Sequence, residues 1–376
     1  MAHAGDGLND NSPHRARYLM LGGFLGAGKS TAVGRLAQRL KDRGLRVGLI
    51  TNDQGQGLVD TANLRHQGFR VEEIAGGCFC CRFDSLKDAA AKLTAEERPD
   101  VFVAEPVGSC TDLLATVSYP LRRLYGDRFD VAPLSVMMDP RRAARVLQVV
   151  PGRRFSPKVA YVYQKQLEEA QVLVINKIDV LEDEARRELR QALQGRYPEA
   201  TIFEVSARTG EGLEAWFDHL DEHSLGHRPA MEIDYEVYGE GEARLGWLNA
   251  TLRLDAAEEL DGNAWTEDFA RALQGHLESQ GAEVAHLKMT LSPHTGPGDL
   301  ALINLVDRDL VPELSERLGA PVRKAQLVVN LRAEATSDTL ASALDQEVAG
   351  RRELVLEHVE HFAPGQPRPT HRLTCA

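Results

Sequence analysis

A glycine-rich segment near the amino terminus has the residue types and spacing that bind nucleotide phosphates. Its sequence, GFLGAGKS at residues 23–30, matches G-x-x-x-x-G-K-[ST] and stands between an apolar run and a run with helical periodicity. Glycines let the backbone approach a phosphate closely, and successive N–H groups at the start of a helix donate to its oxygens. Lys29 adds a positive charge at the β and γ phosphates, where it is also a catalytic candidate, and the Ser30 hydroxyl can ligate Mg²⁺. The predicted phosphate-binding residues are Gly23, Gly26, Ala27, Gly28, Lys29, Ser30 and Thr31.

A second motif, Asn176-Lys177-Ile178-Asp179, follows another apolar run and predicts the base. A carboxylate can accept hydrogen bonds from guanine N1–H and from the 2-amino group, and adenine lacks this pair of donors. Ser206-Ala207, after the next predicted strand, is similar to the guanine-contacting turn of GTPases. The plain alternative for Asp179 is an acid at a helix start, because four-letter strings are common. We predict GTP and GDP as ligands, bound by Asn176, Lys177, Asp179, Ser206 and Ala207.

Two acids follow two further predicted strands, Asp53 in TNDQG and Glu105 in EPVG. In a parallel sheet, the loops at the carboxyl ends of strands gather around the ligand. Asp53 and Glu105 are therefore candidates for binding Mg²⁺ or positioning the attacking water, and solvated loop acids are the alternative. Gly108 is a candidate for binding the γ-phosphate through its N–H.

Three of the five cysteines, Cys78, Cys80 and Cys81, fall within the run GGCFCC. Thiolates are soft ligands for Zn²⁺ and suit Co²⁺ less well, so this run predicts a transition-metal site. In an extended chain Cys81 would point away from the other two, unless the preceding glycines bend the segment. Three thiolates leave a fourth tetrahedral position open, as a transfer site requires; inert buried cysteines are the alternative. We expect Cys110 to be a buried structural residue rather than a fourth ligand.

The predicted fold is an α/β P-loop NTPase with a mostly parallel sheet, plus a smaller C-terminal α+β domain. Short apolar strands alternate with helices in the first half, which indicates a parallel sheet covered on both faces. Predicted strands there are 17–21, 47–51, 101–104, 131–138, 171–175 and 201–205, and predicted helices include 31–43, 85–93 and 182–194.

The second half has the order β-α-β-β-α-β of a ferredoxin-like unit. Its predicted elements are strand 245–254, helix 265–280, strands 284–291 and 300–306, helix 311–318 and strand 325–331, followed by a polar helix from Ser337. His358 and His361 would meet one ion on a helix, although a solvated helix face is favoured. The predicted boundaries are a disordered 1–16, a GTPase domain 17–221, a linker 222–230, a C-terminal domain 231–362 and a Pro-rich tail 363–376.

Composition excludes several classes of protein. The chain of 376 residues has 44 Lys and Arg against 56 Asp and Glu, a formal net charge of −12. A general binder of nucleic acid or of anionic membranes would be basic. No apolar run approaches the ~20 residues of a membrane span, and the first 17 residues contain no apolar signal-peptide core. We expect a cytoplasmic protein that binds neither nucleic acid nor membrane.

The motifs GFLGAGKST, GGCFCC, EPVG and NKID occur in the order found in the CobW family of P-loop GTPases, which this sequence resembles over residues 17–220 and more weakly beyond. The resemblance implies Mg²⁺-dependent GTP hydrolysis coupled to delivery of a transition metal to a client metalloprotein or cofactor pathway. Zn²⁺ is the expected metal, with Co²⁺ or Fe as alternatives, and a homodimer is left open. Intrinsic turnover is expected to be slow because no arginine finger is evident from the sequence.

The sequence departs from the family pattern around its second-strand loop. Thr51 and Gln56 stand where many members have acids, Asp53 stands where Glu is common, and a His-rich loop is absent. A different coordination set or metal is therefore open. One competing hypothesis is a GTP-dependent chaperone of a client protein, in which the thiols only sense metal. Another is an ATP-dependent small-molecule kinase, against which NKID and Ser206-Ala207 argue.

Overall fold

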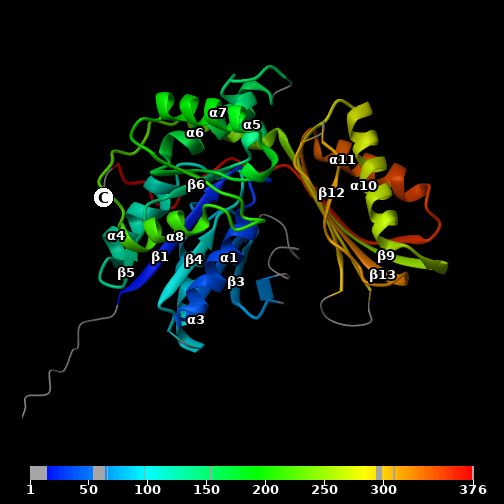
Figure 1. Ribbon diagram of the computed structural model, residues 1–376, viewed down its shortest axis with the longest axis horizontal. Helices are drawn as coiled ribbons and strands as arrows, with labels where there is room; N and C mark the ends of the chain where they lie inside the picture. Colours follow the sequence, from blue (N-terminus) through cyan, green and yellow to red (C-terminus); the bar gives the residue numbers. More distant parts are fainter. Residues whose placement is uncertain are drawn as a thin grey trace, which may run out of the picture.

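Two sheets organise the protein, each with helices packed against it (Figure 1). The computed structural model describes residues 15–53, 64–65, 67–96, 98–152, 155–293, 299–307 and 310–374. The first sheet has the order β3-β2-β4-β1-β6-β7-β8, with β5 beside β1, and its pairs are parallel. The second has the order β12-β11-β10-β13-β9-β14 and is antiparallel. The predicted fold class, an α/β parallel sheet followed by a C-terminal α+β domain, is confirmed.

The first sheet contains one strand that the sequence pattern missed. Its strands are β1 (Ala16–Gly23), β2 (Val47–Asp53), β3 (Arg70–Ala75), β4 (Val101–Glu105), β5 (Phe129–Val131), β6 (Ser135–Met138), β7 (Val172–Ile175) and β8 (Thr201–Glu204). The edge strand β3, RVEEIA, is short and half charged, so it lacks the apolar run of its buried neighbours. The single strand predicted at 131–138 is two strands, β5 and β6, both beside β1.

Helices cover both faces of this sheet, and a separate apolar cluster lies under each layer. The amphipathic helix α1 shows the spacing that drives this packing, because Ala32, Val33, Leu36 and Leu40 recur at helical intervals and are buried. The helices are α1 (Lys29–Asp42), α3 (Phe83–Glu96), α4 (Tyr119–Tyr125), α5 (Pro140–Val146), α6 (Pro157–Glu169), α7 (Asp183–Arg196), α8 (Leu213–Glu222) and α9 (Tyr235–Ala243), with a π-helical turn at Leu114–Ser118 and a 3-10 turn at Ile178–Val180.

The C-terminal domain has the split β-α-β connections predicted, but from partly different segments. Its elements are β9 (Leu245–Leu260), α10 (Gly262–Ser279), β10 (Glu283–Pro293), β11 (Ala301–Leu305), β12 (Glu313–Glu316), β13 (Val322–Glu334), α11 (Ser337–Ala349) and β14 (Leu354–Phe362). Strand β13 lies between β9 and β10, and β9 lies between β13 and β14, so two β-α-β units interlock.

Two predicted elements of this domain are wrong. The helix predicted at 311–318 is instead strand β12, paired with β11 in an added hairpin. An eight-residue apolar pattern does not separate helix from strand, and this one is short for a helix. His358 and His361 lie on strand β14, not on a helix, so three residues of spacing point them to opposite faces. They cannot share an ion as proposed.

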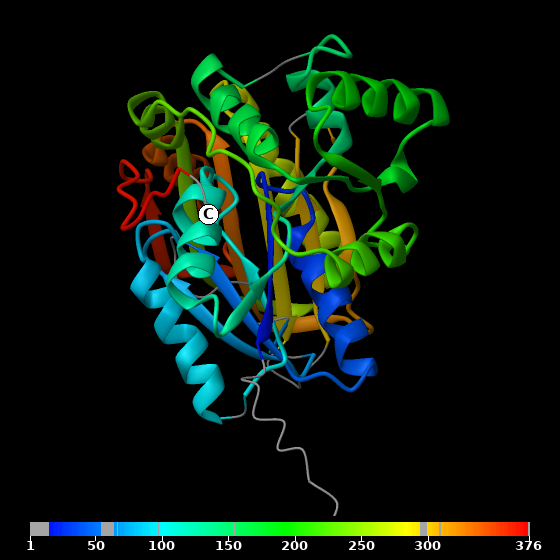
Figure 2. The same ribbon diagram turned by 90° about the vertical axis from the view of Figure 1, so that its left-hand side faces the viewer.

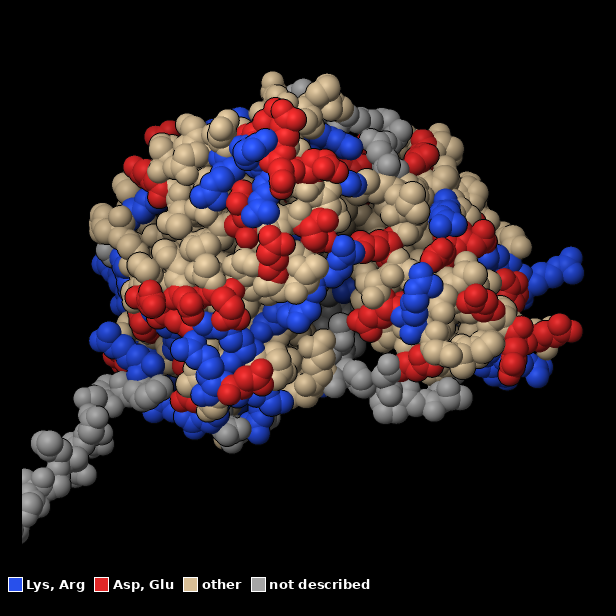
Figure 3. Space-filling view, in the orientation of Figure 1, with Lys and Arg blue, Asp and Glu red and all other residues tan. Residues whose placement is uncertain are grey.

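The second sheet turns one face toward the first domain and the other toward α10 and α11, as Figures 1 and 2 show from two directions. The face under the helices is apolar and includes Leu287, Met289 and Leu331. After β14 the chain returns to the first domain, where Thr370 N donates to Cys80 O at 2.9 Å. Acidic and basic side chains are interspersed over the face seen in Figure 3. In the described part of the chain, no helix combines the length and apolarity needed to cross a membrane.

A buried carboxyl at the end of α6 makes stability depend on pH. Glu169 accepts hydrogen bonds from Thr111 Oγ1 at 3.0 Å and from Leu114 N at 3.1 Å. Burial, and then the neighbouring charge of Asp112, raise the pKa of Glu169 from 4.5 to about 8. The folded state therefore keeps a proton that the unfolded state releases, so this contribution to stability is lost as pH rises from about 5 to about 8.

We predict that Glu169→Gln, which resembles the neutral acid, flattens this pH dependence. At pH 9 the variant should melt above the wild-type protein by at least ~2–4 °C, the equivalent of ~1 kcal/mol in a domain of this size, and the gap should close at pH 5. Melting curves of both proteins at pH 5 and pH 9 measure this difference in melting temperature. Glu168→Gln is the control, because Glu168 is half exposed and pairs with Lys165. A gap at pH 9 no larger than that of the control would contradict the assignment.

Candidate nucleotide and metal sites

The predicted phosphate loop lies between β1 and α1 in the geometry its glycines permit. Gly26 and Gly28 have φ of 74° and 91°, a conformation that disfavours other residues. A Cβ on Gly28 would also lie 2.3 Å from Asn176 Nδ2. Lys29 Nζ donates to Gly23 O at 2.9 Å, and Ser30 Oγ donates to Glu105 Oε1 at 2.9 Å. The hydroxyl and carboxylate predicted to face Mg²⁺ are therefore adjacent.

Asn176 ties the base-recognition motifs to the phosphate loop. Its amide nitrogen donates to Ala27 O at 2.8 Å, and its amide oxygen accepts from Ala207 N at 2.9 Å. Asp179 pairs with Arg208. Although partial burial opposes it, hydrogen bonding from Ser206 and the charge of Arg208 lower the pKa of Asp179. These contacts favour the charged form of Asp179, which our prediction of guanine recognition requires.

A cavity of about 990 Å³ joins these motifs, a volume suited to a nucleotide. Eleven of the predicted residues line it: Gly26, Gly28, Lys29, Ser30, Thr31, Glu105, Gly108, Asn176, Lys177, Asp179 and Ala207. Gly23, Ala27 and Ser206 lie behind this lining. They contact it through the hydrogen bonds of Lys29 to Gly23 O, of Asn176 to Ala27 O and of Ser206 to Asp179. The side chain of Asp53 and the whole of Gln56 lie outside the described residues, while Thr51 lines the cavity.

The C-terminal sheet supplies one wall of this cavity, which motif reasoning missed. His286 and Lys288 on β10, and Asn330 and Arg332 on β13, line it opposite the phosphate loop. Alternation of polar and apolar residues along β10 was the available signal. For Arg142 of α5, the sequence contains no comparable signal. This arginine is buried and donates to Leu25 O at 2.6 Å and to Ala285 O at 2.9 Å, so it fastens the phosphate loop to the C-terminal domain.

The three clustered thiols converge, as a metal site requires. The Sγ–Sγ distances are 2.9 Å for Cys78–Cys80, 3.2 Å for Cys78–Cys81 and 3.7 Å for Cys80–Cys81. Gly76 and Gly77, with φ of 72° and 154°, bend the chain before Cys78. The N–H groups of residues 81 and 82 then close a turn on Cys78 O at 3.1 and 2.9 Å. The bend brings Cys81 to the same side as the other two.

Cys110 is buried near this group, in line with our expectation. It is 1% exposed and belongs to the apolar cluster that also contains Cys78 and Cys80, whereas the described ligand atoms that lie within 4.8 Å of one another are those of Cys78, Cys80 and Cys81. Hydrogen bonds from Cys110, Cys80 and Cys81 lower the pKa of Cys78 well below its usual range. Hydrogen bonding, with Cys110 first and then with Cys78, raises the pKa of Cys80, and hydrogen bonding with Cys78 raises the pKa of Cys110. The sequence gap between Cys110 and the GGCFCC run hides their burial in one apolar cluster.

A small cavity of about 350 Å³ opens beside the thiols. Glu242 and the C-terminal tail line it together with Cys78 and Cys81. The tail also contacts the thiol turn directly, because Arg368 N donates to Cys81 Sγ at 3.1 Å. Glu242 is 1% exposed, and its Oε1 has no hydrogen-bond partner among the described residues.

Two short connections link the nucleotide cavity to the thiols. At the end of β2, Asn52 lines the nucleotide cavity and makes three hydrogen bonds, one to the end of β3 and two to the thiol turn, residues 76–82. Its amide nitrogen donates to Ile74 O at 2.8 Å and Gly77 O at 2.6 Å, and its oxygen accepts from Phe79 N at 3.0 Å. At the end of β4, the loop 105–110 begins at the partner of Ser30 and ends at Cys110, which is buried in the same apolar cluster as Cys78 and Cys80.

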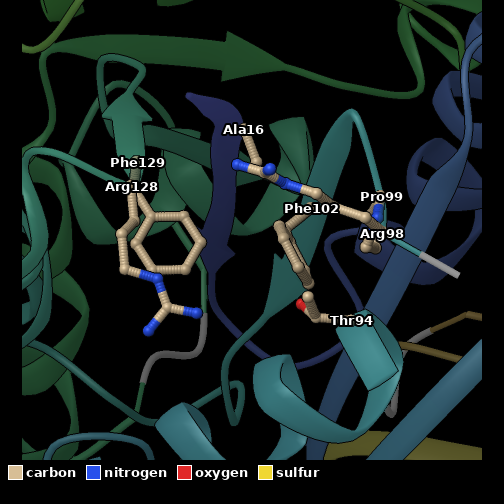
Figure 4. A pocket seen from close by; sticks show the side chains of 7 residues that line it. All are labelled: Ala16, Thr94, Arg98, Pro99, Phe102, Arg128 and Phe129. Carbon is tan, nitrogen blue, oxygen red and sulfur yellow. The ribbon is translucent and has the colours of Figure 1, made fainter. Parts of the chain in front are cut away.

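A separate cavity of about 290 Å³ lies at the other edge of the sheet (Figure 4). Its lining includes the ring of Phe102, the ring of Phe129 and the start of β1 at Ala16. It is therefore at the amino ends of the strands, away from the edge where ligands of parallel sheets bind. Arg98 and Arg128 are its charged residues, and among the residues that the structure describes no acid or thiol lines it.

A comparison of the chain with known families agrees with the motifs and with their geometry in the structure. The family model described as CobW/HypB/UreG, nucleotide-binding domain, matches residues 17–204, which is half of the chain. The chain belongs to this family. Its match covers the phosphate loop, the thiol turn, loop 105–110 and NKID, but it ends before Ser206 and before the C-terminal domain.

Relatives of the CobW/HypB/UreG family member described here have names that mention zinc. A protein named zinc chaperone CobW from Sinorhizobium sp is 27% identical over 60% of this chain and 71% of its own length. A zinc chaperone YeiR from Escherichia coli is 26% identical over 46% of this chain and 49% of its own. The zinc-regulated GTPase metalloprotein activator 1 of Dictyostelium discoideum is 22% identical over 49% of this chain and 44% of its own length. The chain thus spans about half the length of the latter two.

Solved structures in the comparison are more distant. HypB from Helicobacter pylori in complex with nickel is 20% identical, with a TM-score of 0.42, covering 56% of this chain and 87% of that one. The Zn(II)-bound YjiA GTPase from E. coli is 14% identical, with a TM-score of 0.36, covering 88% and 98%. We assign no residue role from either.

We predict that Asn52→Ala weakens metal binding, because Phe79 N–H and the carbonyls of Ile74 and Gly77 lose their partner. Loss of such supporting bonds lowers metal affinity by ~10–100-fold. Competition with a chromophoric chelator for Zn²⁺ measures it. Asn304→Ala is the matched control: Asn304 lines the same nucleotide cavity, but its amide bonds Ser315 rather than the thiol turn. Equal Zn²⁺ affinity in the two variants would refute the supporting role.

Proposed function

We propose that this protein is a GTPase metallochaperone in which the nucleotide sets how tightly the thiols hold a transition metal. The observation that carries the proposal is the pair of connections at the ends of β2 and β4. Asn52 lines the nucleotide cavity and bonds the thiol turn, and loop 105–110 runs from the cavity to Cys110, in the apolar cluster that contains Cys78 and Cys80. A change at the γ-phosphate therefore has a path of a few residues to the metal ligands.

The nucleotide side of this proposal uses the residues in the cavity. On binding, Lys29 would exchange its bond to Gly23 O for the β and γ phosphates. Asp179 would exchange Arg208 for the guanine edge. Ser30 and Glu105 present adjacent oxygens, the ligand type that Mg²⁺ prefers, and Mg²⁺ bound there would neutralise phosphate charge. Asp53 remains proposed as a further Mg²⁺ ligand or a water-positioning acid.

Gly108 is proposed to bind the γ-phosphate through its N–H. A Cβ at this position would lie 3.0 Å from Leu25 N, so residue 108 packs directly against the phosphate loop. Its carbonyl and that of Cys110 both accept from Gln166 Nε2, at 3.0 and 2.8 Å. Movement of Gly108 toward a phosphate would therefore carry the Cys110 end of the loop with it.

The metal is proposed to be cargo rather than a resident cofactor. The thiol donors suit Zn²⁺, and the relatives named zinc chaperones support that choice over Co²⁺ or Fe. The recipient is proposed to be a client metalloprotein, recognised by the C-terminal domain. A cytoplasmic location, a slow hydrolytic rate and a homodimer stay predictions, as do the domain boundaries at residues 221 and 231.

The coupling is tested by titrating the apo protein with Zn²⁺ in the presence of GDP or of a non-hydrolysable GTP analogue. A coupling free energy of ~1–3 kcal/mol predicts affinities that differ by about 5–150-fold. Glu105→Gln, at the start of the connecting loop, should reduce the difference while Zn²⁺ binding without nucleotide is kept. Identical Zn²⁺ affinities in both nucleotide states would end the coupling proposal.

Base selectivity is a separate prediction. Asp179→Ala removes the acceptor for the two guanine donors, so GTP affinity should fall toward that for ATP. Competition between GTP and ATP for a fluorescent nucleotide measures the ratio. Glu313→Ala is the control, since Glu313 pairs with the same Arg208 on the cavity rim without lying in the NKID motif. A wild-type preference for ATP would instead favour the small-molecule kinase.

A further inference from the structure

We propose that the C-terminal tail, residues 363–374, is a strap over the thiol turn that must lift before a metal ion can enter or leave. The strap follows β14, which ends at Phe362, and it has no regular secondary structure. Cys78 and Cys80 are only 5% and 1% exposed, and the strap lines the small cavity beside the thiols. The strap therefore forms one wall of the space through which an ion would reach them.

Prolines determine how the strap bonds to the turn. Proline has no N–H and favours an extended backbone in the residue before it, so the backbone donors within residues 367–370 are those of Arg368 and Thr370. Both donors are used on the turn: Arg368 N donates to Cys81 Sγ at 3.1 Å, and Thr370 N donates to Cys80 O at 2.9 Å. The Thr370 hydroxyl adds a bond to Cys81 O at 3.2 Å. The strap is thus matched to two consecutive cysteines.

One of these bonds reaches a sulfur of the thiol cluster itself. Cys81 is the least buried of the three clustered cysteines, and it lines the small cavity. Groups that hydrogen-bond to metal ligands orient them, and loss of such a group typically lowers metal affinity by ~10–100-fold. Resting on the proposed function, the inference is that the strap both encloses the metal site and tightens it. When the strap lifts, Cys81 Sγ loses the Arg368 N–H.

The strap is fastened at both ends, so its middle can lift without detaching the chain. At the far end, Arg372 Nε donates to the buried carboxylate of Asp112 at 2.7 Å. At the near end, Phe362 stacks on Trp247 with ring centroids 5.9 Å apart. Between these points, the hydrogen bonds to the thiol turn come from residues 368 and 370. Breaking this short set of bonds is enough to uncover the turn.

Helix α9 provides the seat of the strap at Gly239. A Cβ on Gly239 would lie 2.8 Å from Gln366 Cγ and 3.4 Å from Pro367 Cδ, so the missing side chain lets the strap lie close to the helix. Pro367 is buried there. A larger residue at position 239 would push the strap outward without touching a cysteine. It would not weaken the helix, because glycine is among the least favourable residues in a helix interior.

Reaction of the metal-free protein with the thiol reagent DTNB tests the covering role. In a Cys375→Ser background, Gly239→Val should react ~10-fold faster or more than the background protein, because the rate follows the population in which the strap is lifted. Gly275→Val is the matched control: Gly275 is also a helical glycine, on α10, and no described atom lies within 4 Å of a Cβ there. Equal melting temperatures of the two variants show that both are folded. Equal reaction rates would overturn the covering role.

Transfer of Zn²⁺ to a chromophoric chelator tests the hold on Cys81. Arg368→Pro removes the N–H that reaches Cys81 Sγ, whereas Arg368→Ala keeps it and is the control. Zn²⁺ should leave Arg368→Pro faster, with an affinity ~10–100-fold below that of Arg368→Ala. Equal release rates and affinities would overturn the tightening role. Neither experiment uses nucleotide, so both stand if GTP coupling fails. A wild-type protein that binds no Zn²⁺ would end the proposed function, while the DTNB rates would still decide whether the strap covers the thiols.

Discussion

The arrangement depends on one constraint, that β2 and β4 are hydrogen-bonded parallel neighbours whose carboxyl ends reach the same edge of the sheet. Thr51 pairs with Glu105 in that register, so the residues that follow each strand emerge side by side. One strand end continues to Asn52, which holds the thiol turn, and the other continues to the loop that ends at Cys110. The nucleotide cavity and the thiol turn are close together because the pairing of β2 with β4 brings these two strand ends to the same place.

Burial of the thiols has a consequence for chemistry. An apolar setting disfavours several thiolates at once, and here hydrogen bonding lowers the pKa of Cys78 and raises that of Cys80. A divalent ion bound as proposed would pair with the charge of each added thiolate. The tail covers the cluster from outside, with Thr370 N bonded to Cys80 O and Arg368 N to Cys81 Sγ. The cluster is therefore largely enclosed rather than an exposed reactive surface.

Sequence reasoning found the parts of the site that lie in continuous motifs. The phosphate loop, NKID and the GGCFCC run each combine local spacing with backbone chemistry, so each could be predicted from its own residues. Asn52 and Arg142 could not, because their contacts arise from strand order and from the approach of distant segments. The short, charged strand β3 and the strand β12 were not predicted as strands for a related reason. Each is a strand because it pairs with a neighbour, and neither has an apolar pattern of its own.

The C-terminal domain is bound into this arrangement rather than appended to it. Its ferredoxin-like sheet buries one face under α10 and α11, which leaves the polar face with His286, Lys288 and Arg332 to complete the nucleotide cavity. Arg142 bonds the phosphate loop at Leu25 and the C-terminal backbone at Ala285 through one guanidinium, and Arg145 pairs with Asp307 at 2.5 Å. A nucleotide that shifts the phosphate loop must therefore move or strain the contacts with the second domain. The same ligand can thus affect the thiol turn through the first sheet and the C-terminal domain through Arg142.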